Sequence, residues 1–414
     1  MTYMDQLGQN AIKAKKILSV LSTDKKNAAL KQMASGLLEN VEQILAANMT
    51  DVDNARKKGI KETLIDRLSL SNKRVEAMAQ GILDCAAFPD PVGEILEEKI
   101  LDNGLKLKKV RVPMGVIGII YESRPNVTTD AAGLCFKAGS ATILKGGSDA
   151  INTNKAIMET IRRSLIKQSL PEGCIQLVLD TGRETVLQMM RANEYIDLLI
   201  PRGGAELIAS VVKNATVPVI ETGTGNCHVY IDREYNEKYA KDITVNSKCS
   251  RPGVCNAIET LLVHKDIYKK ILPVIWEGLK EYDVLIRGDE RTREILDFAE
   301  PATEEDWATE YLDFILAVRV VDSIDEAIGH INKYGTKHSE CIITDIEESK
   351  IRFRNEIDAA CVYVNASTRF TDGGVFGSGA EIGISTQKLH ARGPMGAREI
   401  TTYKYIIDGE GQIR

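Results

Sequence analysis

The 414-residue sequence lacks the long apolar runs, paired metal-ligand motifs and strong basic charge that mark several large protein classes. Its longest apolar runs, such as residues 116–121, fall far short of the roughly 20 residues that a membrane-spanning helix needs. Its five histidines form no HExxH pair and its eight cysteines no CxxC, so a structural zinc site is not expected. The net charge of −6 provides no global basic field for nucleic acid.

The sequence also lacks a disulfide framework and a signal peptide. Eight cysteines are scattered through it without regular spacing, which is typical of reduced thiols, so we expect a cytoplasmic protein. Apolar residues make up 43% and charged residues 27%, the balance of a soluble globular protein. The length exceeds one ordinary core and predicts two or three domains.

Two kinds of pattern divide the chain. Residues 5–85 repeat apolar side chains at helical spacing, which predicts a helical first part. Residues 99–108 alternate around Asn103-Gly104, which predicts a β-hairpin that projects as a ribbon. Residues 401–407 form a terminal strand that either pairs with this ribbon or with another subunit, because an open edge needs covering.

From residue 110 onward, strand, turn and helix alternate. This rhythm predicts an α/β fold with parallel, doubly wound sheets and ligands at the carboxyl ends of the strands. The expected strands are residues 116–121, 141–145, 175–179, 198–200, 227–231, 259–264, 284–287, 314–321, 341–344 and 360–365.

Cys255 is the candidate nucleophile. It follows a Pro252-Gly253 turn and has Arg251 four residues upstream, a setting that exposes a thiol and favours its thiolate. The alternative is a small buried hydrophobic residue, the common environment of a free cysteine. Cys249 has no turn to present it, and we interpret it as a spectator.

Five motifs in a fixed order resemble the aldehyde dehydrogenase superfamily. They are Pro113-Met114-Gly115-Val116-Ile117-Gly118, Arg124-Pro125-Asn126, Lys145-Gly146-Gly147-Ser148, Glu221-Thr222-Gly223-Thr224-Gly225-Asn226 and Pro252-Gly253-Val254-Cys255. Within the superfamily, residues 121–127, 251–257 and 379–385 are most similar to the reductases of glutamyl 5-phosphate.

The resemblance implies an aldehyde-dehydrogenase-like architecture of two doubly wound α/β domains and a small β ribbon for oligomerisation. The expected parts are an NADP-binding domain over residues 1–98 and 110–226 with 366–399 returning to it, a catalytic domain over 227–365, and oligomerisation strands over 99–109 and 400–414.

The resemblance also assigns an oxyanion donor. Asn126 matches the superfamily's side-chain donor, and the backbone N–H of Cys255 would be its partner in stabilising a tetrahedral oxyanion. The alternative for Asn126 is a turn-forming role beside Pro125.

Several residues are expected to bind the cofactor. Lys145 ends a predicted strand, so we expect its ammonium to emerge beside a ribose or phosphate. Many superfamily members carry an acidic residue where this chain has Ser148, and a carboxylate there would repel the 2′-phosphate of NADP. NADP(H) is therefore favoured over NAD(H), although the carboxylate of Asp149 is close enough in sequence to oppose this.

Gly203 and Gly204 open a predicted helix and would let backbone N–H groups approach a pyrophosphate. The chain does not keep a full GxGxxG there. Glu310 aligns with the superfamily glutamate that holds the nicotinamide ribose, and its alternative is a solvated charge in an acidic stretch.

Four further residues are less specific candidates. Glu221 occupies the place of a glutamate that activates water in aldehyde oxidisers, but a reductase of an acyl phosphate must avoid water, so a structural or proton-handling role is expected. Arg124 and Arg251 are candidates for the substrate's anionic groups or for loop anchors. His338 is a candidate proton donor. No metal ligand is assigned.

The function implied by the resemblance is NADPH-dependent reduction of glutamyl 5-phosphate through a Cys255 thioester, in proline biosynthesis, by a homo-oligomer with a possible glutamate kinase partner. One alternative is a non-phosphorylating aldehyde dehydrogenase that oxidises a small aldehyde. Another is an inactive scaffold for the kinase. Neither nucleic acid nor a membrane is expected as a partner.

Overall fold

The computed structural model describes residues 2–377 and 379–414, which divide into two compact units. Unit 1 takes in the described residues of Met1–Thr222, Gly377–Gly383 and Pro394–Arg414, and unit 2 those of Gly223–Phe376 and Ile384–Gly393. The boundary lies four residues before the predicted one. The predicted return of residues 366–399 to the first domain is wrong in part, because residues 366–376 and 384–393 belong to unit 2.

The expected helical first part is present. It contains α1 (Tyr3–Leu18), α2 (Thr23–Glu39), α3 (Val41–Lys57), α4 (Glu62–Leu68) and α5 (Asn72–Ala87). Ser22 and Ser71 accept hydrogen bonds from the third backbone N–H of the helices that they cap, and Thr2 forms a capping box with Asp5. Leu30, Met33 and Leu37 of α2 are fully buried, as their helical spacing requires.

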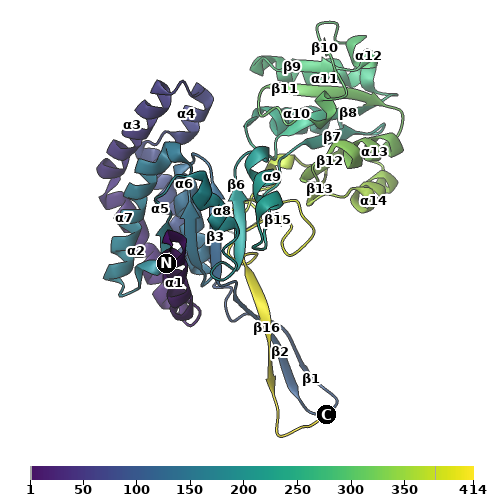
Figure 1. The fold of residues 1–414 in the computed structure, drawn as a ribbon. Coiled ribbons are helices and arrows are strands. Elements are labelled where there is room, and N and C mark those ends of the chain that lie inside the picture. The colour runs from purple at the N-terminus through teal and green to yellow at the C-terminus, as the bar shows by residue number, and fades with distance from the viewer. Residues whose placement is uncertain (1, 378) are drawn as a thin grey trace. The chain divides into compact units, whose positions relative to one another are not determined.

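A four-stranded parallel sheet of order β5-β4-β3-β6 forms the centre of unit 1 (Figure 1). The chain adds strands on one side of β3 and then on the other, so a topological switch point lies between β3 and β6. The elements are β3 (Val116–Tyr121), α6 (Pro125–Lys137), β4 (Ala141–Lys145), η1 (Ser148–Ala150), α7 (Ile151–Lys167), η2 (Glu172–Cys174), β5 (Ile175–Leu177), α8 (Arg183–Met190), β6 (Leu198–Arg202) and α9 (Ala205–Asn214).

The predicted ribbon is a three-stranded antiparallel sheet that extends from the rest of unit 1 (Figure 1). Its strands are β1 (Ile95–Ile100), β2 (Lys106–Pro113) and β16 (Thr401–Asp408). Gly104 adopts a left-handed φ of 86° in the turn, which the Asn-Gly pair predicts. Within the chain, β16 pairs with β2 from Thr401 opposite Pro113 to Asp408 opposite Lys106, so the first of the two alternatives for the terminal strand is confirmed.

A seven-stranded parallel sheet of order β10-β9-β11-β8-β7-β12-β13 forms unit 2. The elements are β7 (Cys227–Ile231), α10 (Glu237–Cys249), β8 (Ile258–His264), α11 (Tyr268–Leu279), η3 (Lys280–Tyr282), β9 (Leu285–Gly288), α12 (Glu290–Arg293), β10 (Glu300–Pro301), η4 (Asp306–Ala308), β11 (Ile315–Val321), α13 (Ile324–Tyr334), β12 (Ser339–Ile343), α14 (Glu347–Glu356), β13 (Cys361–Val364) and η5 (Thr368–Phe370). The chain then forms the short strands β14 (Ile384–Ser385) and β15 (Gly393–Pro394).

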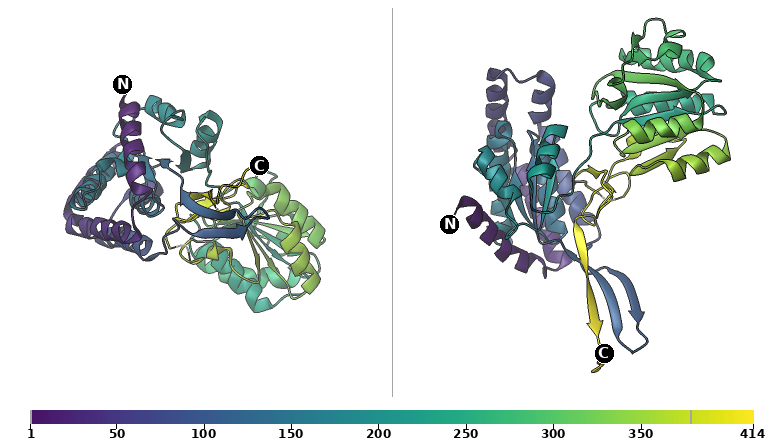
Figure 2. Two further views of the ribbon diagram at one scale, coloured as in Figure 1. Left: turned by 90° about the horizontal axis from the view of Figure 1, so that it is seen from below. Right: turned by 45° about the vertical axis from the view of Figure 1, so that its right-hand side comes forward.

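Helices cover both faces of the seven-stranded sheet (Figure 2). Alternate residues of β7 enter different cores, because Val229 packs with residues of α10 and α11, whereas Tyr230 packs with residues of α13 and α14. This arrangement confirms the predicted doubly wound α/β fold of unit 2. In the described part of the chain, no helix is long and apolar enough to cross a membrane.

Candidate active site

Cys255 lies in the turns between α10 and β8, and its side chain is partly exposed. Cys249 ends α10 and is 5% exposed. Burial raises the pKa of the Cys249 thiol to about 11, which keeps it protonated and unreactive at neutral pH. The contrast expected between the two cysteines is therefore present.

Gly225 packs directly against the backbone of Cys255, the candidate nucleophile. A Cβ atom added at Gly225 would lie 1.5 Å from the carbonyl oxygen of Cys255. The same carbonyl oxygen lies 3.1 Å from Sγ of Cys227, which donates to it. Gly225 donates its backbone N–H to Oε1 of Glu310 at 2.6 Å. The glycine-rich segment before β7 thus fixes the position of the Cys255 turn, and Glu310 holds that segment.

A fully buried ion pair braces the two ends of the Cys255 turn. Lys248, in the last turn of α10, lies 2.5 Å from Glu259 at the start of β8, and neither side chain is exposed. Glu259 also accepts the backbone N–H of Leu312, two residues after Glu310, at 3.2 Å. Burial raises the pKa of Glu259 to about 7 and lowers that of Lys248, because desolvation disfavours both charges.

The candidate residues of unit 2 lie at the amino ends of the strands, which corrects our expectation for this sheet. Gly225 precedes β7, Cys255 precedes β8, Glu310 precedes β11 and His338 precedes β12. The carboxyl-end rule was drawn from nucleotide-binding sheets, and it does not hold where helix-to-strand connections carry the functional side chains.

His338 is fully buried beside this segment. Its Nδ1 lies 3.7 Å from Sγ of Cys227 and 2.8 Å from Oγ of Ser339. The imidazole thus contacts a side chain that itself contacts the Cys255 carbonyl. Its role in proton transfer stays a prediction.

In unit 1, the candidate residues do lie at the carboxyl ends of strands. Tyr121 ends β3 and Arg202 ends β6, at the switch point of the sheet. A Cβ added at Gly203 would lie 2.6 Å from Cδ of Glu122, so a larger residue there would displace the Glu122 side chain. Gly204 is the N-cap of α9 and exposes the backbone N–H groups of that helix. Glu221 is half-buried and closes this unit's main segment.

Asn126 lies in the first turn of α6, which begins at Pro125. Proline suits the first helical position, because its missing N–H would have no intrahelical partner there. Arg124 is the N-cap, so its side chain leaves the chain just before this helix. Nδ2 of Asn126 donates to Oδ2 of Asp130 at 3.0 Å, an i, i+4 contact that fixes the amide.

Asp130 was missed by sequence reasoning, although its i+4 spacing from Asn126 was a usable signal. The residue is half-buried, but protein atoms surround its carboxyl group, and this burial raises its pKa to about 6. The hydrogen bond from Asn126 and the charge of Arg202 oppose that rise, whereas the charge of Glu381 adds to it.

Lys145 is 5% exposed, so its ammonium does not emerge as expected. Its Nζ turns back to the carbonyl oxygen of Gly146 at 3.0 Å, and burial lowers its pKa. Ser148 is exposed. Asp149 forms an ion pair of 2.8 Å with Lys58.

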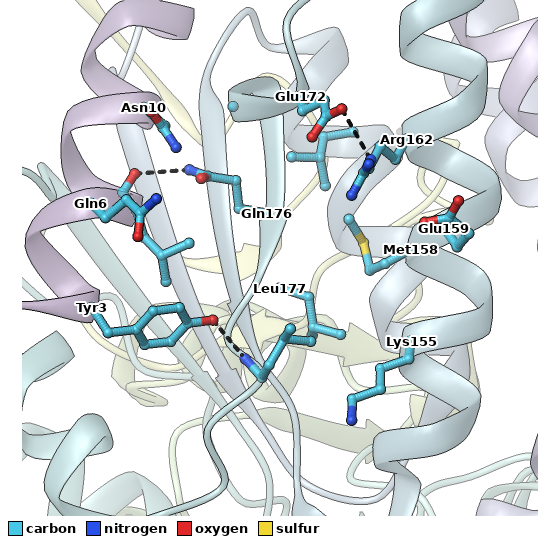
Figure 3. Close-up of a pocket in the computed structure, with 14 residues that line it drawn as sticks. Tyr3, Gln6, Asn10, Lys155, Met158, Glu159, Arg162, Glu172, Gln176 and Leu177 are labelled. Carbon is cyan, nitrogen blue, oxygen red and sulfur yellow. Dashed lines mark hydrogen bonds and ion pairs between the residues drawn. The ribbon is translucent and has the colours of Figure 1, made fainter.

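A cavity of about 420 Å³ lies elsewhere in unit 1, between α1, α7 and the edge strand β5 (Figure 3). Tyr3 and Gln176 at its wall form hydrogen bonds that link β5 to α1, and Arg162 pairs with Glu172 at its rim. None of the predicted site residues lines this cavity. It is therefore separate from the candidate active-site residues of this unit.

Comparison with known proteins decides the family. The family model for the aldehyde dehydrogenase family matches residues 2–293. Gamma-glutamyl phosphate reductase of Caldanaerobacter subterraneus subsp. tengcongensis is 58% identical over 406 residues, 98% of each chain. That of Listeria innocua is 56% identical over 414 residues, 100% of each chain. The crystal structure of gamma-glutamyl phosphate reductase from Thermotoga maritima matches at TM-score 0.97 and 50% identity over 100% of each chain.

The chain belongs to the gamma-glutamyl phosphate reductase family, within the aldehyde dehydrogenases. The expected resemblance and fold class are therefore confirmed. An acetylating aldehyde dehydrogenase from Geobacillus thermoglucosidasius shows the same fold at TM-score 0.70 and 17% identity, over 99% of this chain and 97% of its own. Members of this family are oxidoreductases, and the roles of individual residues in this chain stay predictions.

The close approach of Gly225 predicts that Gly225→Ala displaces the Cys255 turn. The added methyl group would overlap the Cys255 carbonyl oxygen, so we expect the free energy of unfolding to fall by about 1–3 kcal/mol. We also expect a several-fold change in the rate at which iodoacetamide alkylates Cys255. Gly329→Ala in α13, where a Cβ meets nothing within 4 Å, is the matched control. Unchanged stability and alkylation in Gly225→Ala would contradict the assignment.

The Asn126–Asp130 contact predicts a pH-dependent positioning effect. Asp130→Ala should lower kcat by about tenfold to 100-fold, because the Asn126 amide loses its orientation. Asp130→Asn keeps an acceptor oxygen but cannot ionise. The wild type should gain activity as pH rises through about 6, when the carboxylate forms, and Asp130→Asn should lose that step. Identical pH–kcat profiles for the two proteins would refute this role.

Proposed function

We propose that this chain reduces L-glutamyl 5-phosphate to L-glutamate 5-semialdehyde and phosphate with NADPH, through a thioester on Cys255, as a step of proline biosynthesis. The observation that carries the proposal is the partly exposed Cys255 in its braced turn, in a chain whose curated relatives at 56–58% identity are gamma-glutamyl phosphate reductases.

In this mechanism the Cys255 thiolate attacks the carbonyl carbon of the acyl phosphate. The Asn126 amide and the Cys255 backbone N–H donate to the oxyanion that develops. Asp130 keeps the amide oriented, since one N–H of Asn126 is committed to it and the other is left to donate. Collapse of the tetrahedral adduct releases phosphate and leaves the thioester.

NADPH, when bound, would supply a hydride for reduction of the thioester to a thiohemiacetal. The residues of unit 1 suit such a cofactor, because Gly203 and Gly204 open α9 at the switch point and leave space that a side chain would fill. Lys145 and Ser148 follow β4 in the same unit. In unit 2, Glu310 accepts the backbone N–H of Gly225, and we propose that it also binds the nicotinamide ribose.

The thiohemiacetal then collapses to the aldehyde and the free thiolate. This sequence requires that water stay away from the thioester, since hydrolysis would waste the activated substrate. We therefore assign Glu221 a structural or proton-handling role and His338 a role in proton supply. Arg124 is proposed to bind an anionic group of the substrate.

We further propose that the chain works as a cytoplasmic homo-oligomer joined through the ribbon. All eight cysteines are free, which suits a reducing compartment. The ribbon exposes Ile95, Ile100, Tyr405 and Ile407, each more than half exposed. Apolar side chains on an unpaired sheet edge favour pairing with a second copy. A separate glutamate kinase would deliver the labile acyl phosphate.

Cys255→Ala should lower turnover by at least about 10⁴-fold while NADPH affinity stays nearly unchanged. The assay follows NADP reduction by glutamate 5-semialdehyde in the presence of phosphate, and a fluorescence titration measures NADPH binding. Cys249→Ala is the matched control and should retain activity, because its thiol is buried.

The same assay separates the alternatives. Full turnover without phosphate would favour a non-phosphorylating aldehyde dehydrogenase. No turnover by the wild type, together with stable binding of a glutamate kinase, would favour the scaffold. Substantial activity of Cys255→Ala would remove the nucleophile from the proposal.

Ser148→Glu should weaken NADPH binding by at least about tenfold and weaken NADH binding far less, because a carboxylate repels the 2′-phosphate. Lys58→Ala should shift the preference in the same direction by releasing Asp149 from its ion pair. Ser148→Ala is the control and should change neither affinity. The measurement is the Kd of each cofactor, and equal losses for both cofactors in Ser148→Glu would count against NADP selectivity.

A further inference from the structure

Arg369 lies in η5, and hydrogen bonds hold this element against the Cys255 turn. Oγ1 of Thr368 donates to the carbonyl oxygen of Asn256 at 2.7 Å, and Nδ2 of Asn256 donates to the carbonyl oxygen of Thr371 at 2.8 Å. The residue next to the nucleophile is thus tied to both sides of Arg369. The backbone of Arg369 is fixed relative to Cys255.

The Arg369 side chain is anchored at one end. Its Nε donates to Oγ of Ser250 at 3.0 Å, which directs the guanidinium along the segment that leads to Cys255. Arg369 interacts electrostatically with both Arg251 and Cys255. These hydrogen bonds hold Arg369 against the segment that carries the candidate nucleophile, and Arg251 lies four residues before Cys255 in the same segment.

These two arginines have no carboxylate that neutralises them by contact. Among the described residues, no Asp or Glu forms an ion pair with Arg251 or Arg369, and Asp372 acts on Arg369 only through space. Burial lowers the pKa of Arg369, and the charge of Arg251 adds to this effect. Arg369 is half-buried and Arg251 is exposed, and two positive charges without a paired carboxylate favour the binding of an anion.

We infer that Arg369 and Arg251 bind the phosphoryl group of the acyl phosphate and receive the phosphate that leaves. This inference rests on the proposed function. Two guanidinium groups match a phosphoryl dianion in charge, and their planar N–H pairs match its oxygen atoms. The bridging oxygen of the phosphoryl group is bonded to the carbon that Cys255 attacks, whereas three carbon atoms separate that carbon from the substrate's α-carboxylate. Two arginines on or against the segment that carries Cys255 are therefore better placed to bind the phosphoryl group than the α-carboxylate.

The step balances without a further reactant. The thiol loses its proton, the C–S bond forms, and the C–O bond to the phosphoryl group breaks with its electron pair remaining on oxygen. The phosphate gains one proton, equal to the one that the thiol lost. The arginines lower the barrier by stabilising the negative charge that collects on the leaving oxygen.

The test measures phosphate-dependent oxidation of glutamate 5-semialdehyde by the full-length wild type, Arg369→Gln and Arg369→Lys. We expect Arg369→Gln to raise the KM for phosphate by at least about tenfold, with the KM values for NADP and semialdehyde within about twofold. The KM of Arg369→Lys for phosphate should lie between those of the wild type and Arg369→Gln. A lysine ammonium keeps the positive charge but lacks the paired N–H groups of a guanidinium. Arg354→Gln, an exposed arginine of α14, is the control for net charge.

A second readout does not depend on turnover. Inorganic phosphate should slow the alkylation of Cys255 by iodoacetamide in the wild type and protect Arg369→Gln much less. If Arg369→Gln raises the KM for semialdehyde and leaves the KM for phosphate unchanged, the two arginines bind the α-carboxylate and the inference is wrong. If Arg369→Gln lowers the Tm but leaves the KM values and the protection of Cys255 by phosphate unchanged, Arg369 only stabilises the end of α10, and the inference is wrong. A wild type without phosphate dependence would instead refute the proposed function itself.

Discussion

The Lys248–Glu259 ion pair is the constraint on which the candidate nucleophile's turn depends. Both side chains are fully buried. The pair joins the last turn of α10 to the start of β8, and Cys255 lies in the connection between these two elements. Removing one partner of such a pair leaves an uncompensated buried charge, which costs about 3–5 kcal/mol. The pair also holds the backbone of Leu312, and through the neighbouring Glu310 it restrains the Gly225 segment.

This bracing explains why a short irregular connection can hold a reactive group steadily. The Cys255 turn has few ladder hydrogen bonds of its own, because it lies outside the strands. Its position is set by Gly225 and Cys227, which contact the Cys255 carbonyl, and by the hydrogen bond from Asn256 to the carbonyl oxygen of Thr371. Loops that carry function are usually positioned by rigid elements around them, and here the rigid elements are the amino ends of β7 and β8.

Local patterns predicted much of the fold. The Asn103-Gly104 pair located the hairpin, because Gly104 accepts the left-handed φ that the turn requires. The apolar runs located the strands of both sheets, and the Pro-Gly turn located the presented cysteine. The resemblance to aldehyde dehydrogenases supplied the family and the expected partners of Cys255.

The features that were predicted wrongly or missed depend on contacts between residues that are far apart in the sequence. Burial of Lys145 depends on the packing around β4, and a strand-end position in the sequence does not reveal it. The division of residues 366–399 depends on hydrogen bonds to residues more than 100 positions earlier, such as Thr368 to Asn256. Arg369 carried no motif, since its proximity to Cys255 arises from that same long-range contact. Asp130 was the exception, because its helical spacing from Asn126 was visible.

The pairing of β16 with β2 also determines when the ribbon can form during synthesis. Pro113 on β2 lies opposite Thr401 on β16, so roughly 290 residues separate the two strands along the chain. At about 5–20 residues per second, the ribosome takes roughly 15–60 s to make them. During that interval the β1–β2 hairpin presents an unpaired edge beside exposed isoleucines. Until β16 is made, the edge of β2 therefore stays open to pairing with another strand, which is a route to misassembly.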